Sequence, residues 1–193
     1  MKKYILIACV FCFSISFAQD QKDKNFIDAD NLSEDQLANL ANTAPKNGWV
    51  LLKYKGENHI VNYSNKEYTL WMSAKCSKTS QQPSYLIEFS NNYGDKEMGG
   101  IDFISSKGNQ HAKTIFYLDG KDFENPFLKA KNKNYNVFYE ALKAAKVLKI
   151  EVYDNEFDPE TGKDAIKLNR SVAFKLGNGQ LLDTAVNCKD DSQ

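Results

Sequence analysis

Histidine is scarce in this chain, and no catalytic or zinc-binding motif surrounds the few histidines that it has. The 193 residues include two, His59 and His111, and neither lies in an HExxH segment or near a nucleophile-elbow sequence. Acidic residues distant in sequence remain a source of paired hydrolytic carboxylates, but no spacing points to one pair. The sequence therefore identifies no catalytic residue.

A large net charge is also lacking. The chain has 25 basic and 25 acidic residues, so it is formally neutral. A neutral chain without a recognisable nucleic-acid module is not drawn strongly to nucleic acid or to an anionic membrane. We therefore expect the partner to be a protein or a glycan and not a nucleic acid.

Long apolar runs are missing except at the start of the sequence. Residues 1–18 read as a secretory signal peptide, with Lys2 and Lys3, an apolar core at 4–13 and the small-x-small site Ser16-Phe17-Ala18. A membrane-spanning helix needs about 20 apolar residues. A lipobox-like LIAC segment ends at Cys9, too near the first residue to favour lipidation. We expect export to the periplasm or beyond, with no integral membrane segment in the mature chain.

Cysteine is scarce as well, and its placement predicts one disulfide. Two of the four cysteines lie in the expected leader, which leaves Cys76 and Cys188. Thiols outside the cytoplasm are oxidised by default, so we predict a bond between this pair. The alternatives are two buried free thiols or a metal pair, although two cysteines without nearby histidines make a poor metal site.

Aromatic residues, in contrast, are plentiful and stand in short alternating runs. Twelve Phe, ten Tyr and two Trp favour a β-rich domain. We divide the chain into the leader at 1–18, a flexible lead-in with a short helix at 19–47, and a single β-rich domain at 48–193. The predicted class is α+β, a mostly antiparallel β-sandwich or partly open barrel with two to three peripheral helices.

Period-two patterns and turn residues place the strands of this domain. The clearest strand is 67–78, in which Leu70, Met72 and Cys76 share one side and Trp71 lies on the other. Trp71 would contact a partner if its side faced solvent, and would belong to the core if a helix covered it. Further strands are predicted at 49–55, 59–63, 85–89, near 101–103, 113–118, 149–153 and 168–175. Helices are predicted at 34–42, 135–145 and 180–188.

One acidic segment after the strand at 149–153 resembles a calcium-binding loop. Its acidic residues recur at every second position and are followed by Gly162; they are Asp154, Glu156, Asp158 and Glu160. An EF-hand would have glycine where Pro159 stands and glutamate where Ala165 stands. The alternative is a solvated hairpin tip. Calcium is the one cofactor that the sequence brings into consideration.

Charge is segregated along the second half of the chain. Residues 107–149 hold nine lysines against four acids, a net of +5, whereas residues 151–164 hold six acids against one lysine, a net of −5. Lys129, Lys131 and Lys133 fall in the loop before the helix at 135–145. They are candidate contacts for an anionic glycan or an acidic protein surface, and the alternative is a solvated face.

The order of these elements resembles a group of small exported proteins. A strand ending in Cys76, the helix over Phe138 to Ala145, the Phe174-Lys175-Leu176-Gly177 segment and a short helix ending at Cys188 are similar to invasion-associated-locus-B-like and type VI secretion-accessory periplasmic proteins. The resemblance covers 67–188. It implies a β-sandwich with peripheral helices and non-enzymatic work in the envelope, and it carries over no residue beyond the cysteine pair.

These observations predict an exported binding or accessory module of the cell envelope that recognises a protein or a glycan. An inhibitor or immunity protein that plugs a hydrolase with a loop is the second hypothesis. A hydrolase with convergent carboxylates is the third.

Overall fold

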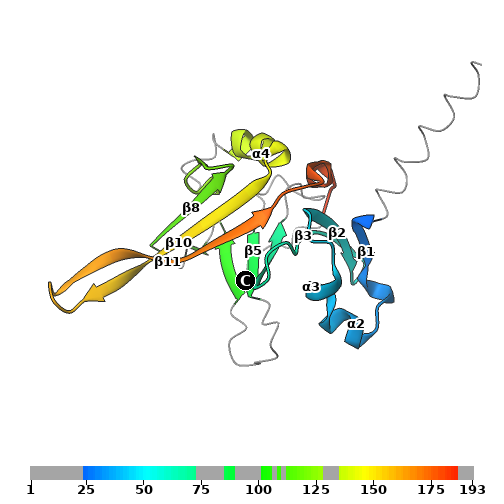
Figure 1. The fold of residues 1–193 in the computed structure, drawn as a ribbon, viewed down its shortest axis with the longest axis horizontal. Helices are drawn as coiled ribbons and strands as arrows, with labels where there is room; N and C mark the ends of the chain where they lie inside the picture. The colour runs from blue at the N-terminus through cyan, green and yellow to red at the C-terminus, as the bar shows by residue number, and fades with distance from the viewer. Residues whose placement is uncertain are drawn as a thin grey trace, which may run out of the picture.

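The computed structural model describes residues 24–72, 85–89, 101–105, 108–109, 112–127 and 135–186 and confirms the predicted α+β class (Figure 1). Its strands form two separate sheets, one of seven strands and one of four, and not a closed barrel. All neighbouring strands are antiparallel except one pair at the N-terminal edge. The packing of these two sheets determines which strand surfaces remain exposed.

The seven-stranded sheet follows the order of the chain. Its strands are β1 (Phe26–Asp28), β2 (Trp49–Tyr54), β3 (Glu57–Asn62), β4 (Tyr68–Met72), β5 (Tyr85–Phe89), β6 (Ile101–Ser105) and β7 (Gly108–Asn109). The β2–β3 turn is Lys55-Gly56, a two-residue turn with positive φ at both positions, and not the Gly56-Glu57-Asn58 turn predicted from the sequence. The Asp30 carboxylate accepts hydrogen bonds from both turn amides.

The four-stranded sheet has the order β11-β10-β8-β9 and contains the longest strands. Its members are β8 (Lys113–Leu118), β9 (Lys121–Asp122), β10 (Val147–Asp158) and β11 (Lys163–Lys175). The β10–β11 register shifts between Val152 and Tyr153, which pair with Arg170 and Leu168. Asn169 is therefore the extra residue of a β-bulge.

The main core lies between the two sheets. Trp49, Ile60 and Leu70 of the larger sheet meet Phe116 and Phe174 of the smaller one, and each is at most 1 % exposed. Helix α4 (Tyr135–Ala144) adds Phe138 and Leu142 to the same cluster. The predicted apolar stripe of this helix therefore faces the core.

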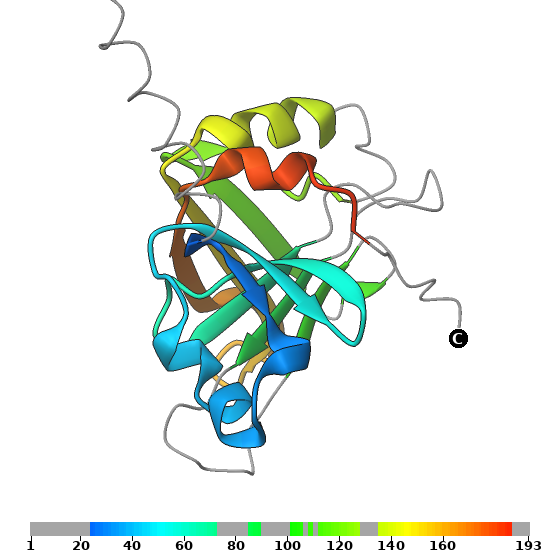
Figure 2. The ribbon, with the colours of Figure 1, turned by 90° about the vertical axis from the view of Figure 1, so that its right-hand side faces the viewer.

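A short helix near the C-terminal end packs beside α4. The sequence predicted an α-helix at 180–188, but the structure has a 3-10 helix, η3 (Gly179–Asp183), which ends where Thr184 becomes extended. The Tyr139 hydroxyl of α4 lies 3.3 Å from the Leu182 carbonyl and 2.6 Å from the Asp183 carboxylate. Figure 2 shows α4 and η3 side by side at one end of the molecule.

The opposite face of the larger sheet is covered by the N-terminal segment. Strand β1 pairs in parallel with β2, and it is followed by η1 (Ala29–Asn31), α2 (Glu34–Ala38) and α3 (Leu40–Thr43). The predicted helix at 34–42 is divided at Asn39, whose φ and ψ are not helical. The capping box of Ser33 and Gln36 is confirmed. The segment expected to be a flexible lead-in thus includes a strand and a cover for the sheet.

Two glycines bring the start of β2 against the end of β11. A Cβ on Gly48 would collide with the Gly177 backbone, and one on Gly177 would collide with the Asn47 carbonyl. The Trp49 amide donates to the Gly177 carbonyl at 3.0 Å across this crossing. The crossing holds the base of the β10–β11 hairpin against the larger sheet.

Within the described part of the chain, no helix has the length and apolar character required to cross a membrane. The expected leader, Cys76 and Cys188 lie outside the described residues.

Candidate functional site

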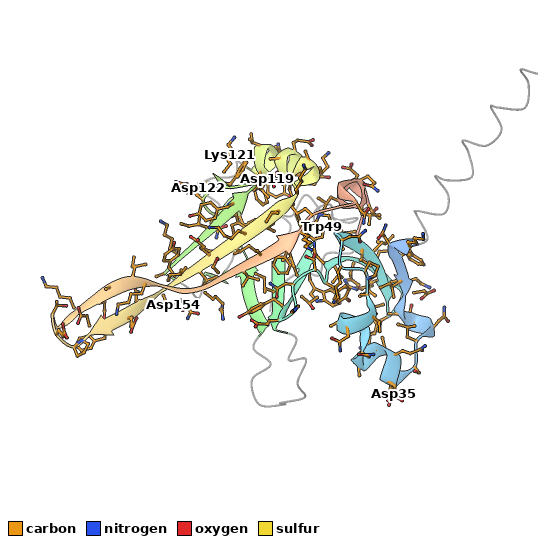
Figure 3. The ribbon with its side chains drawn as sticks, viewed as in Figure 1. Asp35, Trp49, Asp119, Lys121, Asp122 and Asp154 are labelled. Atoms are coloured by element: carbon orange, nitrogen blue, oxygen red, sulfur yellow. The ribbon has the colours of Figure 1, made fainter. Side chains whose placement is uncertain are left out.

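The distal half of the β10–β11 hairpin projects from the body of the protein. Strand β8 pairs with β10 only as far as Tyr153, which lies opposite Lys113. Beyond that pair, the described neighbours of β10 and β11 are each other, and we call residues 154–168 the arm. Figures 1 and 3 show the arm extending away from both sheets, with Asp154 near its base.

The acidic segment predicted as a loop is mostly strand. Asp154, Glu156 and Asp158 belong to β10, and the turn occupies only 159–162. The sequence prediction failed because β11 begins at Lys163, five residues earlier than its apolar pattern indicated, and pairs with this segment. Pairing with β11 makes a strand of residues whose charge pattern resembled a ligand loop.

One face of the arm is apolar and exposed. Directly paired residues of antiparallel strands share a face, so Tyr153 and Leu168, Asn155 and Ile166, and Phe157 and Asp164 all point the same way. The exposed fractions are 62 % for Phe157, 59 % for Ile166 and 51 % for Leu168. Six large apolar side chains of the described residues are exposed, and half of them gather here. A gathering of this kind on a projecting element is typical of an interaction site.

The opposite face of the arm is charged, and its acids contact their own hairpin. The Asp154 carboxylate accepts from the Asn169 side chain at 2.6 Å, and the Glu156 carboxylate lies 3.2 Å from the Lys167 ammonium. Asp158 accepts from the Glu160 amide at 2.9 Å, and this bond holds the pKa of the Asp158 carboxyl below its usual value. Calcium at this segment would compete with these contacts, and it stays a prediction.

Among the residues that the structure describes, no three His, Cys, Asp or Glu side chains gather in a metal-binding arrangement.

Three polar side chains of β10 form a network at the base of the arm. Glu151 accepts from the Lys149 ammonium at 2.8 Å and from the Tyr153 hydroxyl at 2.7 Å. Both bonds lower the pKa of the Glu151 carboxyl, and the bond from Lys149 has the larger effect. The bond to Glu151, followed by desolvation, raises the pKa of Tyr153 to about 12. The network keeps the last body residue of β10 in a fixed orientation.

The outer edge of β11 is covered in the body of the protein. The Lys175 amide donates to the Ser64 hydroxyl at 2.7 Å, and the Lys175 carbonyl accepts from the Asn62 side chain at 2.8 Å. The Ala173 carbonyl accepts from Asn65 at 3.1 Å. The β3–β4 turn thus caps this edge with side chains, one way in which proteins prevent unwanted strand pairing.

Trp71 lies on the covered face of the larger sheet. It is half-buried and packs against a second cluster that contains Val50, Leu52 and Val61. Its ring meets that of His59 edge to face, with centroids 5.3 Å apart. The N-terminal segment covers this face, and Trp71 is partly buried there beside Leu37 and Leu40, which pack against the same cluster.

Other predicted site residues fall outside the described part of the chain, namely Lys129, Lys131, Lys133, Cys76 and Cys188. Sequence reasoning missed Phe157, Ile166 and Leu168 as a site. Apolar side chains at 153 and 157, with Asn155 between them, and at 166 and 168 were the signal, but the acids around them favoured a cation loop.

Comparison with known proteins adds no relative, since no family model, curated protein or solved structure matches this chain.

Proposed function

We propose that this protein is an exported binding module of the cell envelope and that the arm docks it on a partner protein. The observation that carries the proposal is the exposed apolar face of Phe157, Ile166 and Leu168 on a projecting hairpin. Export rests on the leader pattern at 1–18.

The charge of the arm favours a protein over other surfaces. Residues 154–168 hold five acids and two lysines, a net of −3. Anionic lipids and nucleic acids would repel such an element. A glycan is bound mainly by stacking on aromatic rings, and the exposed apolar face of the arm offers one ring, Phe157, beside two aliphatic side chains.

The size of the apolar face favours a different protein over a second copy. A stable interface buries about 800 Å² per partner. In a homodimer formed only by the apolar faces of two arms, the three exposed side chains of each arm would bury well under half of that area. A partner groove that encloses the arm would add contacts to its charged face and its strand edge.

The projection of the arm also supports the inhibitor hypothesis. A narrow hairpin that stands clear of both sheets (Figure 1) has the shape required to enter the cleft of a hydrolase. In that case the partner would be an enzyme, and contact with the arm would lower its activity.

Site-specific crosslinking in cells that express the full chain tests the proposal. A photoreactive amino acid at position 157 is expected to yield a discrete adduct with a second protein. The matched control is position 137, because Val137 on α4 is 59 % exposed and lies off the arm. An Ile166→Ser change in the same chain should reduce the adduct from 157 by at least about tenfold, as losing a central contact does.

Each contrary outcome is decisive. No adduct at 157, or equal adducts at 157 and 137, would end the proposal. An adduct with twice the mass of the chain would identify a second copy as the occupant and would also overturn it.

A further inference from the structure

We infer that the arm recognises its partner by strand addition along the outer edge of β11, from Lys163 to Leu168. The added segment runs antiparallel to β11, with acidic residues opposite Lys163 and Lys167 and apolar residues opposite Ile166 and Leu168. This inference rests on the proposed function and specifies the kind of partner.

The outer edge of β11 is covered by hydrogen-bonded side chains in the body of the protein and is open in the arm. In the body, side chains of Asn62 at the end of β3 and of Ser64 and Asn65 in the β3–β4 turn bond the outward backbone groups of Ala173 and Lys175. In the arm, the part of the chain that the structure describes places no strand or turn beside the outer edge of residues 163–168. The open stretch lies on the projecting half, where a partner segment has access (Figure 3).

The hydrogen-bond phase identifies the residues that would pair. The Val147 carbonyl accepts a hydrogen bond from the Asp119 amide, just beyond β8. The backbone N–H and C=O groups of odd-numbered β10 residues therefore point towards β8, and those of even-numbered residues point towards β11. The backbone groups of Asp154, Glu156 and Asp158 therefore form hydrogen bonds with the backbones of their β11 partners, which are Lys167, Ala165 and Lys163. The backbone groups of 164, 166 and 168 consequently point outward, towards an added strand.

Side chains along this edge determine the chemistry of the segment. Opposed charges and paired apolar residues stabilise neighbouring strands, whereas like charges oppose them. One face of the edge presents Lys163 and Lys167, and the other presents Asp164, Ile166 and Leu168. An acidic segment is excluded from the β10 edge of the arm, because Asp154, Glu156 and Asp158 would lie beside it. Charge therefore favours an acidic partner segment and places it on the β11 edge of the arm and not on the β10 edge.

A pair of synthetic peptides tests the inference on the full chain. The capped peptide VEVTKE places valines opposite Leu168 and Ile166 and glutamates opposite Lys167 and Lys163. The charge-reversed peptide VKVTEK is its matched control. At 90 % occupancy, VEVTKE is expected to slow hydrogen exchange of the Ile166 and Leu168 amides about tenfold, with the inward amides of 165 and 167 unchanged. VKVTEK should leave all four unchanged.

A charge-reversal variant guards against a peptide effect unrelated to pairing. Lys163→Glu combined with Lys167→Glu should transfer protection from VEVTKE to VKVTEK. Failure of both peptides on the native chain would overturn strand addition. Protection of 166 and 168 that depends on protein concentration without peptide would assign the edge to a second copy and also overturn it.

The two proposals fail in different ways. If the adduct at 157 forms but neither peptide protects the edge, the protein docks by its apolar face and only strand addition is wrong. If the peptide protects the edge but no adduct forms at 157, the edge is competent and the proposed function is wrong.

Discussion

The two halves of the β10–β11 hairpin share one backbone pairing but have opposite surroundings. In the body, Phe174 is 1 % exposed and the outer edge is capped by the β3–β4 turn. In the arm, Phe157 is 62 % exposed and both faces meet solvent. The body half stabilises the fold, whereas the arm half adds apolar surface that folding does not bury. Exposed apolar surface on an ordered strand is the observation that supports the proposed docking role of the arm.

The comparison predicts a large difference between two phenylalanine truncations. Phe174→Ala should lower the free energy of unfolding by about 3–5 kcal/mol, because it leaves a cavity in the main core. Phe157→Ala should change it by less than about 0.5 kcal/mol, since its side chain is already in water. Urea denaturation of both variants measures the two values. Equal losses would show that the arm is part of the folding core.

Removing a side chain that covers the outer edge of β11 in the body should have an intermediate effect on the free energy of unfolding. Asn62 is fully buried, donates to the Lys175 carbonyl and accepts from the Ser64 amide. Asn62→Ala should lower the free energy of unfolding by about 1–3 kcal/mol, because the Ser64 amide loses its acceptor and the Lys175 carbonyl keeps only the 3.5 Å bond from the Ser64 hydroxyl. It should also speed amide exchange at Lys175. Asn155→Ala, an exposed arm position, is the matched control, and a loss of similar size there would remove the distinction between the two halves.

The smallest effect concerns pH at the base of the arm. The pKa of Glu151 is lowered, so its contribution to stability is present above its unfolded pKa of about 4.3 and is lost as pH falls through the lower folded value. The pKa of Tyr153 is raised to about 12, so its contribution is present below about pH 10 and is lost between about pH 10 and 12.

Melting temperatures measured across pH 3–12 check both directions. Glu151→Gln should weaken the acid slope, and Tyr153→Phe should weaken the alkaline slope. Slopes identical to those of the native chain in both variants would show that the network does not hold the base of the arm.

Local patterns predicted the body of the fold well. The alternation at 68–72 and 113–118 marked strands whose apolar side is buried. In the alternation at 168–175, Val172 and Phe174 are buried but Leu168 is exposed beyond the bulge. The capping box marked the start of α2. Period-two patterns succeed where one face contacts a core, because burial then selects the residues on that face.

The same logic explains why the arm was missed. Its apolar face meets solvent, so the acids between Tyr153 and Phe157 dominated the pattern and indicated a loop. Strand β1 is three residues long and gains its pairing from β2, which no local signal reveals. The candidate site was therefore least visible in the sequence because it is the part that the fold does not bury.

The bulge at Asn169 affects both the direction of the arm and the side of the ribbon on which its apolar residues lie. If Asn169 paired regularly with Tyr153, Leu168 and Ile166 would lie opposite Asp154 and Glu156, and the apolar face would be divided between the two sides of the ribbon. A bulge also bends and twists its strand. The bulge thus places Ile166 and Leu168 on the side of Phe157, and a chain without the bulge would carry its arm in a different direction.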